Sequence, residues 1–573
     1  MENTEIARVF EEIADMLEIS GGNSYKIRAY KHAALNIREL SKDLKDIYMG
    51  DEKNLRAIPG VGEHIAKKIT ELLETGKVKK HQELLKKISP QLLELMRVSG
   101  IGPKHLRVLH DKLKVNNLDD LEEACLGHKV RDLEGFGEKT EEKILVAVEE
   151  FRHFDKRMKL EPAEQCARAI IRHLKESKVK IDRIEAGGSL RRGRETIGDI
   201  DILVSTDKPE KVTERFISYP EAETVIASGP SKSSIFIKSG VQIDLRVVRD
   251  ESFGAALVYF TGSKAHNVHI RKIAKFKGLK INEYGVFKGD KSIAGKEEED
   301  IYRSIGLRYM PPEIREDRGE IEASSLNKLP ELIELKDIKG DLHLHTDASD
   351  GRQTIVQMAE ASRERGLKYI AITEHSKAVR VAHGLDEKEL FRHIKKIERV
   401  DKKIEGIRIL KGVEVDIGKD GALDLDDSLL KEMDVVIAAV HFRFDLDREK
   451  MTLRLLKAME NRYVNILAHP TGRLIGERKP SEIDFEVIFE EAASRNVAME
   501  LNAHYDKLDL NDIHCRQAKE FGVKVVISTD AHFVDGLDYM KYGITTARRG
   551  WLEKKDVLNT LECGEFLKSI KRS

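Results

Sequence analysis

From residue 340 to the C-terminus, short apolar segments alternate with longer charged stretches whose composition suits helices. The apolar segments cover residues 369–373, 407–415, 435–440, 465–468, 498–502 and 524–529. Apolar runs of this length, separated by helical stretches, predict parallel strands joined by helices. Because the unit recurs so many times, we expect the strands to close into a barrel.

Histidines and carboxylates follow these apolar segments. The carboxyl ends of barrel strands converge on one face, so these side chains are expected to meet in one pocket. Imidazole and carboxylate ligands together suit up to three divalent ions, Zn²⁺ or Mn²⁺. A single histidine at a strand end is more often structural, but nine candidate ligands at successive strand ends favour metal binding. The nine are His343, His345, Asp350, His375, Glu414, His441, His469, Asp530 and His532.

The first 155 residues predict helices, and they contain one pattern three times. Each copy reads hydrophobic, any residue, glycine, hydrophobic, glycine, and precedes a helical stretch. Two such glycines permit a tight turn that exposes backbone N–H groups at a helix N-terminus, which suits a phosphate. One copy fits a helix cap equally well, but three favour binding to a DNA backbone without sequence readout. The glycine pairs are Gly60 and Gly62, Gly100 and Gly102, and Gly135 and Gly137.

Residues 160–310 predict a mixed α/β region with a cluster of carboxylates. Asp199 and Asp201 face the same side of a predicted strand, and Asp244 lies on another strand. Two Mg²⁺ or Mn²⁺ ions between them would relieve the repulsion and suit phosphoryl transfer. An isolated Asp-x-Asp is usually a polar strand edge, but a Gly-Ser turn precedes this one, as in nucleotidyltransferases. The residues expected to hold a triphosphate are Gly188, Ser189, Arg192 and Gly198.

The segment Tyr259-Phe260-Thr261-Gly262-Ser263, followed by Asn267 and Arg271, resembles family X DNA polymerases of the polymerase beta type. Without the resemblance, the aromatic pair would be assigned to the core. The resemblance covers roughly residues 1–315. It implies that Tyr259, Phe260 and Gly262 lie beside the sugar of an incoming dNTP, and that Asn267 and Arg271 face base and template. It also implies gapped or primer–template DNA as the partner.

The sequence departs from this family at two positions near the expected site. Gln242 stands where many members have an arginine that steadies the third aspartate, so Asp244 is expected to be held differently. Lys264 stands where the animal enzyme commonly has an acidic residue beside the incoming base, which would change nucleotide affinity.

The same resemblance raises a 5′-deoxyribose-phosphate lyase activity, which requires an amine that forms a Schiff base. Lys68 falls at the matching position, and Lys26, Tyr30 and Lys80 fall at the matching 5′-phosphate positions. His32 and His64 replace lysines of the better-known enzyme, which makes the cluster less basic. The alternative is that Lys68 is simply a solvated helix lysine.

The histidine-rich region resembles the PHP (polymerase and histidinol phosphatase) family of trinuclear phosphoesterases, which implies a (β/α)7-type barrel. Every one of the nine positions carries a liganding residue type, and Glu414 is the candidate for a carboxylate that bridges two ions. Glu374 stands where an aspartate is often found. Asn502 and His504 are expected either to line the pocket or to form a polar strand-end turn.

We therefore expect a multidomain chain: an all-α N-terminal region with helix–hairpin–helix motifs, an α+β nucleotidyltransferase palm and a C-terminal α/β barrel. The predicted parts are 1–85 (lyase-like helical), 86–155 (second helical subdomain), 156–250 (palm), 251–315 (nucleotide selection), 316–338 (linker) and 339–573 (PHP barrel). Charge is balanced, with 100 Lys+Arg against 101 Asp+Glu, so DNA binding must rely on local patches.

Further expectations concern the setting in which the chain works. Its four cysteines lie far apart, which excludes a disulfide scaffold and fits a reducing compartment. The sequence has no apolar run of about 20 residues, so no membrane partner is expected. We expect a monomer in the cytoplasm of a prokaryotic cell, associated with the nucleoid.

The predicted function is gap-filling DNA repair synthesis with a metal-dependent 3′→5′ exonuclease, and the chemistry would extend to abasic sites. One alternative is a PHP site that hydrolyses small phosphate monoesters. Another is a module that binds gaps or DNA ends and whose palm has lost catalysis. The intact Asp199, Asp201 and Asp244 argue against the second alternative.

Overall fold

The computed structural model describes residues 3–38, 44–56, 58, 61–86, 88–89, 92–93, 95–98, 101–133, 135–154 and 157–572. The chain divides into two compact units. The first contains residues 1–157 with the short segments 237–242 and 317–319, and the second contains the rest. Across the described ranges, no helix is both long enough and apolar enough to cross a membrane.

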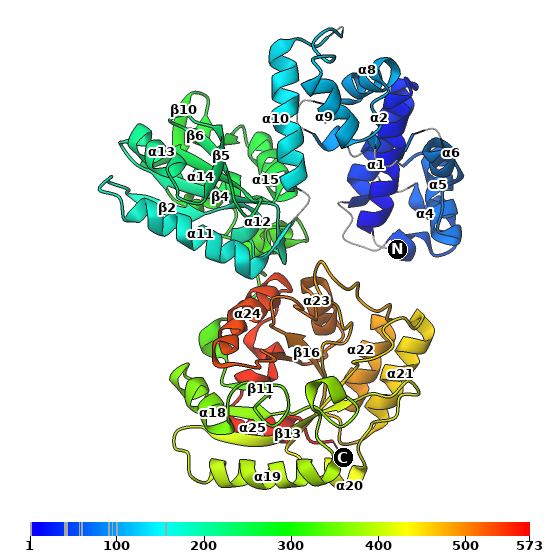
Figure 1. Ribbon diagram of the computed structural model, residues 1–573, viewed down its shortest axis with the longest axis vertical. Coiled ribbons are helices and arrows are strands. Elements are labelled where there is room, and N and C mark those ends of the chain that lie inside the picture. Colours follow the sequence, from blue (N-terminus) through cyan, green and yellow to red (C-terminus); the bar gives the residue numbers. More distant parts are fainter. Residues whose placement is uncertain are drawn as a thin grey trace. The chain divides into compact units, whose positions relative to one another are not determined.

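The first unit is helical around one hydrophobic core (Figure 1). Ile6, Phe10 and Ile13 of the first helix are fully buried, at the spacing that places them on one helical face. Its elements are α1 (Asn3–Ile19), α2 (Ser24–Arg38), α3 (Leu44–Tyr48), α4 (Glu52–Leu55), α5 (Glu63–Thr75), α6 (Lys79–Leu85), η1 (Leu95–Arg97), α8 (Pro103–Leu113), α9 (Leu118–Leu126) and α10 (Glu138–Phe154).

The second unit begins with the predicted palm, a five-stranded sheet in the order β2-β4-β7-β6-β5. Its strands are β2 (Arg183–Ala186), β4 (Asp199–Ser205), β5 (Ala222–Ala227), β6 (Lys232–Ile237) and β7 (Gln242–Val248), with the short pair β1 (Met158–Lys159) and β3 (Thr196–Ile197) beside it. The accompanying helices are α11 (Leu160–Lys175), α12 (Gly188–Arg191) and α13 (Pro209–Ile217).

The predicted nucleotide-selection region follows the palm and has its own core. It consists of η2 (Asp250–Ser252), α14 (Phe253–Thr261), α15 (Lys264–Phe276), a sheet of β8 (Lys280–Asn282), β9 (Gly285–Lys288) and β10 (Lys291–Ala294), and α16 (Glu298–Ser304). The predicted linker, residues 316–338, is not irregular throughout. It contains α17 (Glu320–Ser325) and η4 (Leu335–Asp337), and η3 (Pro312–Ile314) lies just before it. Ile321 of α17 is buried in the same core as Val286 and Tyr302.

The C-terminal region has seven parallel strands in sequence order, from β11 to β17. They are β11 (Gly340–Leu344), β12 (Tyr369–Ile372), β13 (Arg408–Asp416), β14 (Val435–Ala439), β15 (Ile466–Leu467), β16 (Ala498–Asn502) and β17 (Val525–Ser528). A parallel bridge between Leu344 and Ala531 joins the first strand to the segment after the last, which nearly closes the sheet. The predicted (β/α)7 barrel is confirmed.

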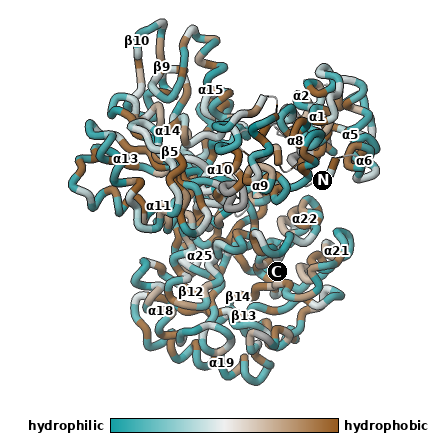
Figure 2. The backbone as a smooth tube through the Cα atoms, turned by 45° about the horizontal axis from the view of Figure 1, so that its top comes forward, coloured by the Kyte–Doolittle hydropathy of each residue, from teal (hydrophilic) through white to brown (hydrophobic). Residues whose placement is uncertain are grey.

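Helices surround these strands (Figure 1). They are α18 (Ile355–Glu364), α19 (Glu387–Asp401), α20 (Asp427–Leu430), α21 (Arg448–Glu460), α22 (Phe485–Arg495), α23 (Asp512–Glu520), α24 (Met540–Arg549) and α25 (Cys563–Ser569), with the short 3-10 turns η5 (Arg380–Ala382), η6 (Val534–Tyr539), η7 (Lys554–Asp556) and η8 (Leu558–Thr560). Figure 2 shows hydrophobic stretches along β12, β13 and β14, whereas α19 alternates between hydrophobic and hydrophilic residues. The strands are buried on both faces, as expected inside a ring of helices.

Candidate active sites

The palm sheet brings the three predicted aspartates together. Asp199 opens β4 and Asp201 follows two residues later, so both carboxylates lie on one face of the strand. Asp244 lies on the neighbouring strand β7. Burial, with the charges of Asp199 and Asp244, raises the pKa of the Asp201 carboxyl to about 7. Such mutual repulsion is what bound divalent cations would relieve.

The Gly187–Gly188 turn lies directly against this cluster. Gly188 has a φ of +61°, and a Cβ there would come within 2.4 Å of an Asp201 carboxylate oxygen. Gly187 N–H donates to the Asp201 carbonyl at 2.8 Å. Only glycine allows the turn to come this close, so the carboxylates and the predicted triphosphate residues share one site. Ser189 follows Gly188 on the short helix α12.

Arg192 is the C-cap residue of α12. Its side chain contacts Glu316 in the predicted linker and Thr261 in the predicted nucleotide-selection region. Its Nε donates to Glu316 Oε1 at 3.0 Å, and its Nη1 donates to the carbonyl of Thr261, at the end of α14. Gly262 has a φ of +73°, and a Cβ there would meet the Arg192 Nη1 at 3.1 Å. The predicted triphosphate arginine therefore contacts the predicted sugar-side loop.

The predicted base-side residues hold the aromatic pair in place. Asn267, on α15, donates its amide to the Tyr259 carbonyl at 2.7 Å. Arg271 Nε donates to the Asn267 carbonyl at 3.2 Å. Tyr259 is 38% exposed, so its ring is open to a ligand rather than part of the core. The Tyr259 and Phe260 rings meet edge to face at 5.1 Å.

An arginine two residues after Asp244 lies beside it. The Arg246 Nη2 atom is 3.9 Å from the Asp244 carboxylate, and the guanidinium stacks over the Phe260 ring at 4.8 Å. On a strand these two residues share a face. Arg246 therefore offers a guanidinium beside Asp244, and how Asp244 is held relative to other family members stays a prediction.

The barrel places its nine predicted ligands at the carboxyl ends of the strands. His343 lies in β11, and His345 follows it at the strand end, where its N–H donates to the Ala531 carbonyl at 3.0 Å. Glu414 lies in β13. The other ligands come from the loops just after a strand, and together with Lys507, Val379 and Ala382 several of them line a cavity of about 290 Å³.

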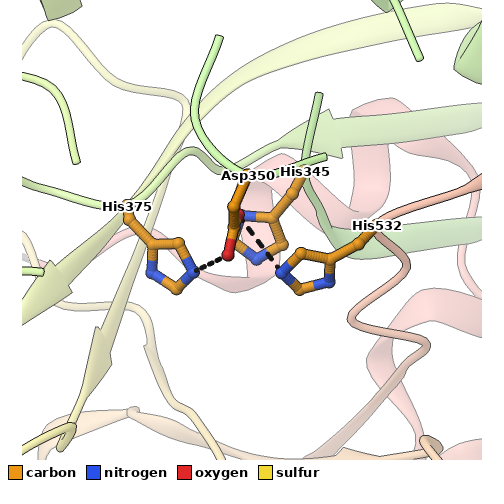
Figure 3. A group of neighbouring side chains, drawn as sticks. All are labelled: His345, Asp350, His375 and His532. Carbon is orange, nitrogen blue, oxygen red and sulfur yellow. Dashed lines mark ion pairs between the residues drawn. The ribbon is translucent and has the colours of Figure 1, made fainter. Parts of the chain in front are cut away.

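The nine residues form four overlapping groups whose donor atoms lie within 4.8 Å of one another. The groups are His345, Asp350, His375 and His532; His343, His469 and Asp530; His343, His345 and Glu414; and His375, Glu414 and His441. Figure 3 shows the first group, with His375 and His532 both directed toward Asp350 at 3.6 and 3.3 Å. Glu414 belongs to two groups, which fits its predicted bridging role.

The charges of the barrel site are strongly coupled. Burial alone would raise the pKa of the Glu414 carboxyl, but His375, His441 and His343 outweigh it and hold that pKa well below its usual range. Burial, together with His532 and His375, lowers the pKa of His345 to about 3, so this imidazole is neutral. The carboxylates of the site raise the pKa of His343, His375 and His441, so these imidazoles must release a proton when they bind a metal ion, whereas His345 is already neutral.

Several of these buried donor atoms form no hydrogen bond of good geometry, although the His375 Nδ1 lies 2.7 Å from Glu414 Oε2 as an ion pair. They include the His343 Nε2, both His345 ring nitrogens, the His375 Nδ1 and one Glu414 oxygen. Leaving such atoms unsatisfied is costly unless a ligand engages them. The donor set of nitrogen and oxygen atoms suits divalent ions such as Zn²⁺ or Mn²⁺. The residues therefore fit a divalent metal centre.

A second layer of carboxylates orients the ligand histidines. Glu500 contacts the His343 Nδ1 at 2.7 Å and accepts the His469 N–H at 2.8 Å. Asp416 contacts the His441 Nδ1 at 2.9 Å. Such contacts hold the other ring nitrogen toward the metal. Neither carboxylate was predicted from the sequence. A signal was present, because Asp416 lies two residues after Glu414 on β13 and Glu500 lies two residues before Asn502 on β16, so each shares a strand face with a predicted site residue.

Two further residues contact the ligands. Asn502 donates to Asp530 Oδ2 at 2.9 Å, but it is fully buried, and neither Asn502 nor His504 is among the residues that line the cavity. Lys507 forms an ion pair with the same carboxylate and lines the cavity. Lys507 lies in a loop without a periodic pattern, so no sequence signal pointed to it. Glu374, in contrast, hydrogen-bonds Thr346 and Ser349 behind the site.

The three glycine hairpins of the first unit have the same type of turn. In the three copies, a hydrogen bond of 3.0–3.1 Å joins the N–H of the residue between the two glycines to the carbonyl three residues earlier. Gly62 and Gly102 cap α5 and α8, and a Cβ at Gly62, Gly102, Gly135 or Gly137 would meet nothing within 4 Å. A phosphate can therefore approach these backbones. Gly60 and Gly100 lie outside the described residues.

The predicted lyase residues lie on several helices of the first unit. Lys68 is half-buried on α5, Lys26 is exposed on α2, and Lys80 forms an ion pair with Glu83 at 3.7 Å. Tyr30 is buried with its ring 5.8 Å from Phe10, and burial followed by the charge of Glu71 raises its pKa to about 12. The lyase assignment stays a prediction.

Four regions of the chain match known protein families. Residues 1–78 match a helix-hairpin-helix domain, 92–150 a SAM-like helix-hairpin-helix tandem, 256–316 the DNA polymerase beta thumb, and 341–504 the PHP domain. These matches confirm the helix–hairpin–helix, polymerase and PHP regions expected from the sequence.

Curated relatives match either the whole chain or its barrel. "DNA polymerase/3′-5′ exonuclease PolX" of Bacillus subtilis (strain 168) is 40% identical over 577 residues, covering 100% of both chains. A "probable phosphatase" of Thermoanaerobacter sp. (strain X514) is 31% identical over 247 residues, covering 40% of this chain and 95% of its own. Because the first similarity runs over the full length, the chain belongs to the family X DNA polymerases that carry a C-terminal PHP domain.

Proposed function

We propose that the chain is a DNA repair polymerase that fills short gaps from dNTPs and trims 3′ ends with its PHP barrel. The observation that carries this is the presence, on one chain, of two separate clusters of side chains that suit divalent metal ions. The palm has three carboxylates beside a glycine turn, and the barrel has nine nitrogen and oxygen ligands around one cavity.

In the palm, Asp199 and Asp201 would hold two ions, Mg²⁺ or Mn²⁺, and Asp244 would assist activation of the primer 3′-hydroxyl. Bound ions there would draw charge from the attacking and leaving oxygens. Gly188, Ser189, Arg192 and Gly198 hold the triphosphate. Tyr259, Phe260 and Gly262 face the sugar, and Asn267 and Arg271 position that loop toward base and template.

In the barrel, the nine ligands would hold up to three ions, Zn²⁺ or Mn²⁺, and Glu414 is the candidate for the carboxylate shared between two of them. Bound ions there would supply an activated water for hydrolysis of a phosphodiester. Lys507, at the cavity wall, offers a positive charge to the phosphate. The glycine hairpins grip the DNA backbone on both sides of a gap, which lets a monomer with balanced charge bind DNA in the cytoplasm.

The test uses a one-nucleotide gapped duplex with a labelled primer and Mn²⁺, with and without dNTPs. Asp199→Ala/Asp201→Ala should abolish extension and leave trimming, whereas His343→Ala/His345→Ala should abolish trimming and leave extension. Loss of both activities in either variant would contradict two independent centres. If the wild type neither extends nor trims, a DNA-end binding role is favoured.

Because relatives of the barrel are named probable phosphatases, a second measurement tests whether the barrel hydrolyses small phosphate monoesters. Release of phosphate from a small monoester is measured beside trimming of the labelled 3′ end. A barrel that prefers the monoester by more than tenfold in kcat/KM would replace the exonuclease assignment.

A further inference from the structure

Barrel helix α24 packs on the palm loop that carries the predicted triphosphate arginine. Gly193, directly after Arg192, has a φ of +63°, and a Cβ there would lie 2.0 Å from the Thr545 Cγ2 of α24. Lys541 and Tyr542, also on α24, contact Glu164 Oε2 of α11 at 2.9 and 2.8 Å. A side chain at Gly193 would therefore collide with the barrel helix, so the palm loop and α24 are closely packed at this point.

Arg549, the last residue of α24, enters this contact and is only 6% exposed. Its Nη1 donates to the Arg192 carbonyl at 2.7 Å and to Glu316 Oε1 at 3.0 Å. Its Nη2 donates to Asp512 Oδ2, on barrel helix α23, at 2.8 Å. One guanidinium thus joins the barrel to both the backbone of Arg192 and the carboxylate that holds its side chain.

Glu316 is the link between the two arginines. The same oxygen, Oε1, accepts from Arg192 Nε at 3.0 Å and from Arg549 Nη1 at 3.0 Å. With its Nε bound to Glu316 and its Nη1 bound to the Thr261 carbonyl, the plane of the Arg192 guanidinium is fixed. Without Arg549, Glu316 would be left with Arg192 and, at 4.0 Å, Arg194, and the carbonyl that sets the Arg192 backbone would lose its donor.

We propose that Arg549 is a positioning residue for DNA synthesis: the barrel, through Arg549 and Glu316, orients Arg192 toward the triphosphate of the incoming dNTP. This inference rests on the proposed function, which assigns Arg192 to the triphosphate. It makes the nucleotide site of the palm dependent on a helix of the other catalytic domain.

The test measures kcat and the dNTP KM for single-nucleotide gap filling by the full-length chain. Arg549→Ala should raise the dNTP KM about tenfold, which corresponds to about 1.4 kcal/mol. The affinity for gapped DNA should change less than twofold. Arg549→Lys, which keeps the charge but reaches fewer acceptors, should recover part of the loss.

Arg548→Ala is the matched control. Arg548 lies on the same helix and binds Glu313 Oε1 at 2.7 Å and the Ile333 carbonyl at 3.0 Å, both in or beside the connecting segment. Neither contact reaches Arg192. A dNTP KM within twofold of wild type is expected for this variant, so an equal rise in both variants would show that the contact is merely structural.

A double-mutant cycle separates the possible outcomes. If Arg549 acts through Arg192, then Arg549→Ala in an Arg192→Ala background should cause no further rise in KM. The inference would be overturned, with the role of Arg192 intact, by either of two results. One is a double variant whose rise in the dNTP KM is the product of the rises in the two single variants, and the other is a KM within twofold of wild type for Arg549→Ala. An unchanged KM for Arg192→Ala alone would overturn both the nucleotide assignment and the inference.

Thermal unfolding and 3′-end trimming report whether each variant folds. If Arg549→Ala does not fold, Glu316→Gln carries the same prediction from the palm side, with a several-fold rise in the dNTP KM. An unchanged KM in Glu316→Gln would then overturn the inference.

Discussion

At the scale of single residues, the second unit depends on carboxylates held between arginines. Glu298 accepts hydrogen bonds from Arg191 at 2.8 and 2.7 Å and from Arg315 at 2.7 Å, and Arg315 is fully buried. Burial by itself raises the pKa of Glu298, but Arg315 and Arg191 outweigh it and lower that pKa to about 2. Removing one partner of such a pair leaves a buried charge without compensation.

Glu298→Gln should therefore destabilise the protein at pH 7, by on the order of 3 kcal/mol. Because the folded-state pKa is lowered, the stabilisation is present above the unfolded pKa of about 4.5 and is lost as the pH falls toward 2. The difference in unfolding midpoint between wild type and variant should shrink from pH 5 to pH 3. Glu299→Gln, at an exposed neighbour, is the control, and a difference that stays constant with pH would contradict the assignment.

Gly188→Ala should reduce gap filling more than tenfold and leave 3′-end trimming unchanged. The new Cβ would lie 2.4 Å from the Asp201 carboxylate and would disturb the metal-binding cluster. Gly289→Ala is the matched control, because Gly289 has a similar φ of +60° but open space around it. Both variants carry left-handed backbone strain of about 1–2 kcal/mol. Equal loss of gap filling in both would attribute the effect to strain rather than to the carboxylates.

At the scale of elements, the hairpins of the first unit use backbone rather than side chains. Gly62 and Gly102 begin α5 and α8 with φ of −82° and −93°, values open to any residue, and a Cβ would meet nothing. The fold therefore does not require glycine at these positions. Glycine at these N-cap positions leaves the backbone open to close approach by a ligand.

Gly102→Val should weaken binding to gapped DNA about fivefold, the effect of losing roughly one net hydrogen bond. The melting temperature should fall only slightly, because the position is sterically open although valine is a poorer N-cap of α8 than glycine. Binding is measured by fluorescence anisotropy at fixed salt. Gly564→Val, at an open glycine of barrel helix α25, is the control and should leave binding unaltered. Unaltered binding in Gly102→Val would remove this hairpin from the DNA interface.

At the scale of the whole molecule, one chain carries two metal-dependent centres. Glu414 is the carboxylate among the nine ligands that belongs to two of the four groups, as the histidines His343, His345 and His375 also do. Asp350, Asp530 and His532 each belong to one group. Loss of the shared carboxylate should therefore cost more ions than loss of a terminal ligand.

The measurement is metal content by mass spectrometry after dialysis against Mn²⁺. Glu414→Gln should lose about two ions relative to wild type, and His532→Ala about one. Chelation of the wild type should lower its unfolding temperature, because ions that bind only the folded state stabilise it. Equal losses in the two variants would contradict a bridging Glu414.

Which residue types carry the chemistry, and in what order the domains follow, can be read from the amino-acid sequence. Strand-end ligands such as His345 and Asp530, and the pair Asp199 and Asp201, follow from strand periodicity, which is a local property of the chain. The hairpin glycines follow from a repeat.

Which residues distant in sequence support these sites is seen only in the folded chain. Glu500 and Asp416 behind the histidines, Lys507 at the cavity, and Arg549 beside Arg192 are brought in by packing between elements far apart in sequence. Such contacts depend on how helices and loops fold over one another. No spacing within a single strand or helix encodes them, because periodicity reports a face and not the partner that covers it.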